Sequence, residues 1–246
     1  MAIEVFNRYE YKYLLDKETY EKVMVIMNEH MNLDLYNIGG KAYTISNIYY
    51  DTPDDFLIRT SLSSPLYKEK LRLRSYGIPQ ISSKVFLEIK KKYQGLVNKR
   101  RTTLILDEAY DFVEKGKAPK QKEYMNAQVV SEIEYFLNIY DLEPKLFLAY
   151  DRIAYFSKES DDLRISFDTN IRSRRYDLGL EMGDYGSQLL DSGVYLMEIK
   201  TALAMPLWLT HMLAELGIKR SSFSKYGTEF MQYISGDGGY NYRIAV

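Results

Sequence analysis

The sequence predicts one α+β domain in which about eight strands, most of them antiparallel, are joined and followed by helices. Three observations support this fold class. Several segments alternate charged and apolar residues, as half-buried strands do. Other segments carry apolar residues at helical spacing. No internal repeat, low-complexity segment or linker divides the 246 residues, so we expect a single domain over residues 1–234 and a flexible tail over residues 235–246.

Strands are expected where β-forming residues gather between turn signals. The expected strands are Val5–Leu14, Tyr43–Asp51, Lys68–Tyr76, Lys84–Lys92, Val97–Leu106, Leu146–Phe156, Leu163–Ser173 and Val194–Lys200. The third and fourth form a predicted hairpin, because a segment rich in Gly, Pro and Ser joins them. The sixth and seventh form a second hairpin.

Helices are expected at Lys17–His30, Pro53–Arg59, Asp107–Val113, Ala127–Tyr140, Leu207–Leu216 and Lys225–Ile234. Asp16 is a suitable N-cap for the first of these helices. Pro53 suits the first turn of the second, where its missing N–H costs nothing. Residues 115–122, rich in Lys, Pro and Gly, predict a loop, and so do residues 177–193, which contain four glycines.

Composition excludes several classes of function. The chain has no cysteine, so disulfides, thiolate metal sites and cysteine nucleophiles are ruled out. Two histidines, His30 and His211, are too few for a multi-histidine metal site, and both are expected to be structural. With 46% hydrophobic and 27% charged residues and a formal net charge of −1, the chain is typical of a soluble globular protein. It lacks the general basic character of a nucleic-acid-binding protein.

The sequence shows no membrane-spanning or secretory signal. Residues 1–15 lack the apolar segment of a signal peptide, and the most apolar stretch, Ala202–Ile218, is interrupted by Pro206, His211 and Glu215. The absence of cysteine favours a reducing compartment. We therefore expect a cytoplasmic protein, and a position at the inner face of a membrane beside a membrane-protein partner stays open.

Basic residues dominate the charged positions of the alternating segments. Eleven basic residues lie on or beside these segments: Arg8, Lys12, Arg72, Arg74, Lys90, Lys99, Arg101, Arg152, Arg164, Lys200 and Lys225. Only four acidic residues share those faces: Glu10, Glu88, Asp168 and Glu198. Because the whole chain is nearly neutral, its positive charge is concentrated on one surface. Such a surface repels itself unless something anionic binds there.

Two arrangements place these charges differently. In the first, an open antiparallel sheet carries helices on its apolar face and exposes its charged face to water. In the second, the sheet closes into a barrel with a charged interior, and eight strands leave room for one small ligand. An interior rich in Arg and Lys suits a ligand with several phosphates. The embedded glutamates then suit a divalent cation that bridges carboxylate and phosphate, as Mg²⁺ commonly does.

Nine short motifs follow one another from residue 8 to residue 226. They are Arg8–Tyr13, Tyr49–Asp51, Lys70–Gly77, Phe86–Lys90, Lys99–Arg101, Tyr150–Arg152, Arg164–Asp168, Leu196–Lys200 and Phe223–Tyr226. No single motif is specific, but the ordered set resembles the triphosphate tunnel metalloenzymes. It resembles most closely their VTC branch, the polyphosphate polymerase domain of the vacuolar transporter chaperone complex and its bacterial relatives. This resemblance implies an eight-stranded antiparallel β-barrel, the triphosphate tunnel, with flanking helices.

The resemblance also implies roles for single residues. It implies catalytic roles for Arg72, Arg74, Lys90, Arg152, Arg164 and Lys200. It implies substrate binding by Lys12, Arg8, Lys99, Arg101 and Lys225. The metal, Mn²⁺ or Mg²⁺, is expected on Glu198, with Glu88 and Glu10 as helpers. The implied partners are ATP and polyphosphate or another triphosphate, with no nucleic acid.

Two positions depart from the family pattern. The triphosphatase branch opens with Glu-x-Glu-x-Lys, and Arg8 stands at the first glutamate position here. That difference favours the polymerase branch over the hydrolases. Some VTC proteins carry a histidine two residues beyond the lysine matched by Lys90, and this chain has Lys92 there. An acid–base role of that histidine therefore does not carry over.

The resemblance implies a metal-dependent polyphosphate polymerase that transfers the ATP γ-phosphate to a growing polyphosphate chain. No protein nucleophile is expected, because positioning and charge stabilisation supply most of the acceleration in phosphoryl transfer. Two alternatives stay open. One is an inorganic or nucleoside triphosphatase in the same tunnel, and the other is a non-catalytic polyphosphate- or nucleotide-binding module. RNA binding is weaker still, because few aromatic residues are placed to stack on bases.

Overall fold

A computed structural model describes residues 9–94, 96–160, 162–202 and 204–236 of the chain. Within this part the chain forms two compact units. Unit 1 consists of Ile45–Ala149 and Ser173–Ser187, and unit 2 of residues 9–44, Tyr150–Arg172 and residues 188–236. Each unit is thus assembled from separate segments of sequence. The single-domain expectation stays a prediction, and most of the expected tail, residues 237–246, lies outside the described residues.

Unit 1 is built on a sheet with the strand order β7–β3–β4–β5–β6. Its strands are β3 (Tyr43–Asp51, from Ile45 on), β4 (Tyr67–Tyr76), β5 (Lys84–Tyr93), β6 (Leu96–Ile105) and β7 (Glu143–Ser157, through Ala149). The strand β4 pairs antiparallel with β3 and β5, and β5 pairs antiparallel with β6. The helices of this unit are α2 (Phe56–Leu62), α3 (Leu106–Lys115) and α4 (Ala127–Ile139).

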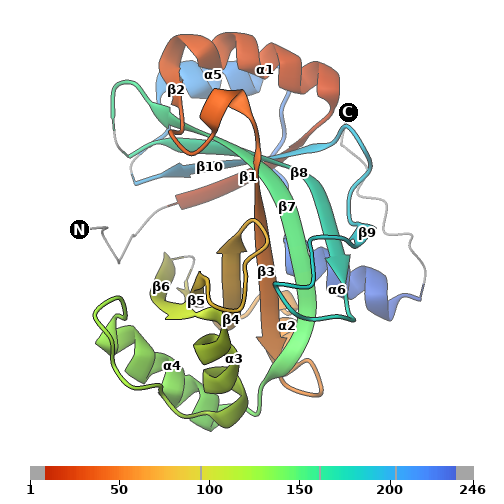
Figure 1. Cartoon of the computed structure of the whole chain (residues 1–246). Helices are drawn as coiled ribbons and strands as arrows, with labels where there is room; N and C mark the ends of the chain where they lie inside the picture. The colour runs from red at the N-terminus through yellow and green to blue at the C-terminus, as the bar shows by residue number, and fades with distance from the viewer. Residues whose placement is uncertain (1–8, 95, 161, 203, 237–246) are drawn as a thin grey trace. The chain divides into compact units, whose positions relative to one another are not determined.

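Alternation along the unit 1 strands buries one face of the sheet. Leu71 and Leu73 of β4 and Leu87 of β5 are fully shielded from solvent. They share a core with Phe112 of α3 and Ile133 of α4, so these two helices cover the apolar face (Figure 1). The residues that alternate with these leucines along each strand point to the opposite face of the sheet. That opposite face carries the charges.

Unit 2 is built on the strand order β1–β10–β8–β7. Its main strands are β1 (Tyr9–Leu15), β10 (Tyr195–Thr201), β8 (Arg164–Arg174, through Arg172) and the second half of β7. The strand β10 pairs antiparallel with both β1 and β8. Short additions are β2 (Met31–Leu33), which pairs with β7, and β9 (Ser187–Gln188), which pairs with β8. The helices are α1 (Lys17–His30), η1 (Ile38–Gly40, a 3₁₀ helix), α5 (Leu207–Glu215) and α6 (Lys225–Ile234).

Two helices cover the apolar face of the unit 2 sheet. Val23 and Met27 of α1 and Leu209 of α5 are buried in one core with Ile165 of β8 and Ile199 of β10. Figure 1 shows α1 and α5 together on one side of these strands. The side chains that alternate with Ile165 and Ile199 point to the other face, and they include the charged residues of both strands.

The predicted fold class is confirmed. The eight strands expected from the sequence correspond to β1, β3, β4, β5, β6, β7, β8 and β10. The helices α1 and α6 have the expected bounds. The short elements β2, β9 and η1 were not expected, because two or three residues carry too little periodicity to be recognised. In the described part of the chain, no helix combines the length and apolarity needed to cross a membrane.

The helix α2 begins at Phe56 and not at Pro53. Asp51, the last residue of β3, is fully buried, and its two carboxylate oxygens accept the N–H groups of Leu57 and Ile58 at 2.8 and 2.9 Å. These are N–H groups of the first helical turn, which have no partner inside the helix. The Tyr-Tyr-Asp motif therefore ends in a structural residue, which fixes where α2 begins.

Replacing Asp51 by Ala is expected to lower the free energy of unfolding by about 1–3 kcal/mol, because two buried N–H groups lose their acceptors. Urea denaturation followed by circular dichroism measures this change. Asp54→Ala is the matched control, since 64% of the Asp54 side chain is exposed, and its effect should stay within about 0.5 kcal/mol. Equal urea midpoints for the two variants would rule out the capping role of Asp51.

Candidate functional site

The charged face of the unit 1 sheet gathers eight basic residues around Glu88. They are Lys68, Lys70, Arg72 and Arg74 on β4, Lys90 and Lys92 on β5, and Lys99 and Arg101 on β6. Strand pairing sets Lys70, Lys90 and Lys99 in one row across the sheet. Arg72, Glu88 and Arg101 form the next row. Directly opposite residues of paired strands share a face, so these nine residues form one surface, here called the Glu88 face.

Glu88 is fully buried and bound by cations at both oxygens. The Nε of Arg72 donates to its Oε2 at 2.7 Å, and the Nζ of Lys99 donates to its Oε1 at 3.2 Å. Arg74 Nε lies 3.9 Å from Oε2 and also donates to Asn47 at 2.8 Å. Burial alone would raise the pKa of the Glu88 carboxyl, but these cations outweigh it and hold the pKa well below its usual range.

Lys99 is the basic residue of this face whose protonation is most open to change. Burial lowers the pKa of Lys99 to about 8, opposed by Glu88 and assisted by the charges of Arg72 and Arg74. About 38% of its side chain remains exposed, so a ligand in solution can reach it. An added anion would favour the protonated form of this amine.

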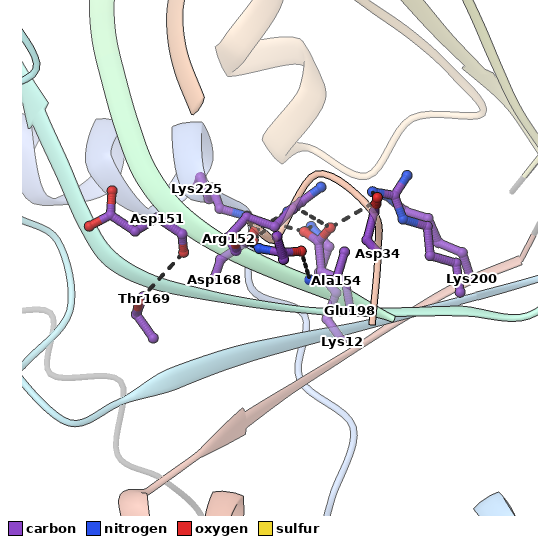
Figure 2. A network of polar contacts seen from close by, with 12 residues as sticks. Lys12, Asp34, Asp151, Arg152, Ala154, Asp168, Thr169, Glu198, Lys200 and Lys225 are labelled. Atoms are coloured by element: carbon purple, nitrogen blue, oxygen red, sulfur yellow. Dashed lines mark hydrogen bonds and ion pairs between the residues drawn. The ribbon is translucent and has the colours of Figure 1, made fainter. Parts of the chain in front are cut away.

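Unit 2 holds a second charged group, drawn in Figure 2. Its members are Lys12 of β1, Arg152 of β7, Asp168 of β8, Glu198 and Lys200 of β10, and Lys225 of α6. We call them the Glu198 cluster. Lys12 lies opposite Glu198 in the β1–β10 pairing. Ser224 caps α6 by accepting the N–H of Gly227 at 3.3 Å, which places Lys225 at the first helical position.

Glu198 is 5% exposed and has four cations around it. Its Oε1 lies 3.1 Å from the Nζ of Lys225 and 3.6 Å from that of Lys12. Its Oε2 lies 3.2 Å from Arg152 Nη2 and 3.5 Å from Lys200 Nζ. Burial opposes ionisation, but the cations, Lys225 first, hold the pKa of Glu198 well below its usual range. The residue is therefore a carboxylate at neutral pH.

Asp168 binds the two buried cations of the cluster more closely than Glu198 does. Its Oδ1 accepts Arg152 Nε at 2.6 Å, and its Oδ2 accepts Arg152 Nη2 at 2.7 Å and Lys225 Nζ at 2.5 Å. Burial lowers the pKa of a lysine, but Asp168 and Glu198 outweigh that effect and raise the pKa of Lys225. Tyr150 lies under both cations, with its ring centre 5.1 Å from Arg152 Cζ and 4.4 Å from Lys225 Nζ.

Arg164 extends the basic surface of unit 2. It lies opposite Lys200 in the β8–β10 pairing, and its Nη2 is 3.3 Å from Oδ2 of Asp34. Asp34 is 6% exposed, and its Oδ1 accepts the N–H of Tyr36 at 3.0 Å. The loop after β2 therefore supplies a fixed carboxylate that orients Arg164.

Glu198 and Glu10 are the carboxylates best placed for a metal ion. Glu10 of β1 lies opposite Lys200 of β10. It is two positions before Lys12, which lies opposite Glu198, so Glu10 and Glu198 share one face of the sheet. Across the residues described here, no group of three or more His, Asp or Glu side chains could hold a metal by itself. The donors fit Mg²⁺ or Mn²⁺ held by one or two carboxylates together with substrate phosphates. Glu88 fits less well, because it has no exposed surface through which a metal ion could reach it, whereas Glu198 is 5% exposed.

The structure brings most of the expected site residues into these two groups. Arg72, Arg74, Lys90, Lys99 and Arg101 lie with Glu88, and Lys12, Arg152, Lys200 and Lys225 lie with Glu198. Arg164 joins the second group through Lys200. Arg8 lies outside the described residues. Asp168 and Asp34 were not among the expected site residues. The sequence could have indicated Asp168, because it lies four residues after Arg164 on β8 and therefore on the same face of the strand. Nothing in the sequence indicated Asp34.

Sequence comparison matches residues 7–233 of this chain to the model of the VTC domain family. The vacuolar transporter chaperone complex subunit 4 of Trypanosoma brucei brucei is 27% identical, over an alignment that covers 72% of this chain. The chain spans 27% of the length of that relative.

Solved structures with a similar fold come from distant relatives. A protein from Bacillus halodurans, described as a candidate adenylate cyclase, superposes with a TM-score of 0.52 at 17% identity, over 90% of this chain and 96% of its own. A protein from Hippeastrum, described as a candidate adenylyl cyclase with a dominant triphosphatase activity, has a TM-score of 0.50 at 17% identity, over 96% of this chain and 97% of its own. At this identity the likeness shows a shared fold, and it agrees with the triphosphate tunnel fold expected from the sequence.

Proposed function

This chain belongs to the VTC domain family, and on that premise we propose that it is a metal-dependent polyphosphate polymerase that uses ATP. The first part of the proposal is that each of the two basic surfaces binds phosphate groups of a triphosphate or of polyphosphate. The second part is that the ATP γ-phosphate is transferred to a polyphosphate chain. Membership of a complex, as in the trypanosome relative, is part of the same proposal and would supply a membrane-protein partner.

The observation that carries the proposal is the surplus of cations over carboxylates on both sheet faces. The Glu88 face has eight basic residues for one glutamate. The Glu198 cluster has four basic residues for two carboxylates, and with Arg164, Glu10 and Asp34 added the surface has five basic residues for four carboxylates. None of these basic residues is fully exposed, so each group holds partly desolvated positive charge. Phosphate oxygens neutralise such charge, and Arg offers them a planar pair of donors.

The proposed reaction needs no protein nucleophile. An oxygen of the terminal phosphate of the chain attacks the γ-phosphorus of ATP, a new P–O bond forms, and the bond between the γ-phosphorus and the bridging oxygen of ADP breaks. Arg152, Lys200 and Lys225 would hold the phosphates and stabilise the charge that accumulates on the equatorial oxygens. Lys12 would bind the neighbouring phosphate groups.

Glu198 and Glu10 would hold the divalent cation, which supplies charge neutralisation at the phosphate oxygens when bound. Their placement on one face of β1 and β10 supports this assignment. We assign Glu88 to a different task, the orientation of Arg72, Arg74 and Lys99, because its carboxylate is completely buried among them.

A triphosphatase is the second candidate, with water in place of the phosphate chain as acceptor. The triphosphatase activity described for the Hippeastrum protein of similar fold favours this candidate. Arg8, at the position where the hydrolases have glutamate, favours the polymerase. Arginine at this position supplies a positive charge that would attract a polyphosphate chain, and it lacks the carboxylate that would bind a metal ion.

The products formed from ATP distinguish these functions. The purified chain is incubated with ATP and Mn²⁺ or Mg²⁺, and the products are separated by polyacrylamide gel electrophoresis and by ³¹P NMR. Long polyphosphate with stoichiometric ADP supports the polymerase. Free phosphate without polyphosphate overturns the polymerase in favour of the hydrolase. Tight phosphate binding without any turnover overturns both in favour of a binding module.

Lys99 makes phosphate binding depend on pH. Because the pKa of Lys99 is about 8 in the chain alone, a bound polyanion should raise it and draw in a proton. Tripolyphosphate titrates in this range as well, so the contribution of Lys99 is the difference in proton uptake between the unchanged chain and Lys99→Gln. This difference is expected to be close to zero near pH 6.5 and up to about one proton near pH 9. Calorimetry in buffers of different ionisation enthalpy measures the uptake, and Lys115→Gln, at a residue with a 61% exposed side chain, should match the unchanged chain.

A further inference from the structure

The Asp168 carboxylate holds two cations of the Glu198 cluster from a position that no ligand in solution reaches. It is fully buried, while Glu198 beside it is 5% exposed. We infer that Asp168 is a positioning residue, which fixes the guanidinium of Arg152 and the ammonium of Lys225 so that they bind phosphate in one defined geometry. This inference rests on the proposed function, because it concerns the same phosphate-binding surface.

The hydrogen bonds of Arg152 fix the direction of its remaining donors. One side of the guanidinium, formed by Nε and Nη2, is bound to the two oxygens of Asp168 at 2.6 and 2.7 Å. Nη2 also lies 3.2 Å from Glu198. Nη1 makes no hydrogen bond with any residue that the structure describes. A bidentate bond to a carboxylate locks the plane of a guanidinium, so Asp168 decides where Nη1 points.

Lys225 is held in the same way. Its Nζ reaches Asp168 at 2.5 Å and Glu198 at 3.1 Å, and the Tyr150 ring lies 4.4 Å away. A lysine has a flexible four-carbon stem, so its ammonium group needs such contacts to stay at one place. Asp168 is the partner shared by Arg152 and Lys225 at the shortest distances (Figure 2). One carboxylate therefore orders two phosphate-binding groups before any ligand arrives.

If Asp168 had a different role, to balance the charge of the cluster, its removal would have the opposite effect on polyanion binding. If the carboxylate only balanced charge, its removal would make the cluster more positive and would strengthen the binding of a polyanion. If it positions Arg152 and Lys225, its removal weakens binding despite the gain in positive charge. Substitutions of residues that orient metal ligands commonly cost about 10- to 100-fold in affinity or activity, and we expect a loss of that size here. The sign of the change therefore separates the two roles.

The test is a double-mutant cycle with inorganic tripolyphosphate, without metal, by calorimetry. Asp168→Asn is expected to weaken binding about 10- to 100-fold in the otherwise unchanged chain. In the Arg152→Ala background the same change should weaken binding by a smaller factor, because only Lys225 is then left for Asp168 to position. Asp151→Asn, the neighbouring acid that binds Thr44 and Asn170 instead, should leave binding unchanged. Equal or tighter binding by Asp168→Asn, or equal losses in both backgrounds, would overturn the inference.

A measurement on the unchanged chain covers the case in which the Asp168 variant fails to fold. In ¹⁵N NMR the Nε–H signal of Arg152 should be protected from exchange without ligand, in contrast to that of Arg59, whose side chain is 55% exposed. Rapid exchange at Arg152 would show that its position is not fixed. Failure of the proposed function would give a different experimental result from failure of this inference. Absence of tripolyphosphate binding, or binding without polymer synthesis, would count against the function and not against the ordering of Arg152.

Discussion

Glu198→Gln is expected to lower the metal-dependent turnover of ATP by on the order of 10²- to 10³-fold, the size seen when one preorganised electrostatic group is lost. The substitution keeps the shape of the side chain and removes its charge. Glu198 is ionised at neutral pH because its cationic neighbours hold its pKa well below the usual range. An amide in its place binds a divalent cation far more weakly, and the metal concentration needed for half-maximal turnover should rise with the loss of rate.

The same substitution should act in the opposite direction on anion binding. Four cations lie within 3.6 Å of the Glu198 carboxylate, and they lose a shared counter-charge when it becomes an amide. Tripolyphosphate binding without metal is therefore expected to stay equal or become tighter. Glu21→Gln, in which an exposed carboxylate on α1 is changed, controls for net charge. If Glu198→Gln kept wild-type turnover and metal dependence, Glu198 would not be a metal ligand.

The strand pattern made the fold and much of the site predictable. Period-two alternation places Arg72, Glu88 and Arg101 on the charged face of their strands, and the structure sets them in one row across the sheet. The alternation works because each strand needs one apolar face against helices, as Leu71 and Leu87 show. The type of a residue and its position in the alternating pattern are thus enough to assign a charged side chain to the correct face of the sheet.

The alternation along a strand shows which face a charged residue occupies, but it does not reveal which charged residues bind one another. Asp168 stood among the charged residues of the strand pattern, but its bonds to Arg152 and Lys225 depend on the placement of β7, β8 and α6 in space. Asp34 was missed altogether, because it lies in a loop whose backbone is fixed by long-range bonds, such as that from its N–H to the carbonyl of Ala154. Such contacts have no local periodicity, so the sequence of one chain does not predict them.

Arg72→Ala is expected to lower turnover of ATP by on the order of 10²- to 10³-fold. Arg72 lies opposite Glu88 on the Glu88 face, where its Nε binds Glu88 at 2.7 Å and its Nη1 lies 3.4 Å from the Tyr49 hydroxyl. Glu88 thereby holds one edge of the guanidinium and orients the remaining donors. Loss of this group removes a fixed pair of phosphate donors and also leaves the buried Glu88 with fewer cations.

Two further variants separate the chemical role of Arg72 from its role in folding. Arg100→Ala removes an arginine from β6, two strands away from β4 and on the opposite face, where it pairs with Glu132 at 2.5 Å. It should cost little turnover, even if it lowers the unfolding temperature as much as Arg72→Ala does. Arg72→Lys keeps the charge and loses the planar pair of donors, so its rate should lie between those of Arg72→Ala and the unchanged chain. Equal rates for Arg72→Ala and Arg100→Ala would remove the Glu88 face from the proposed reaction.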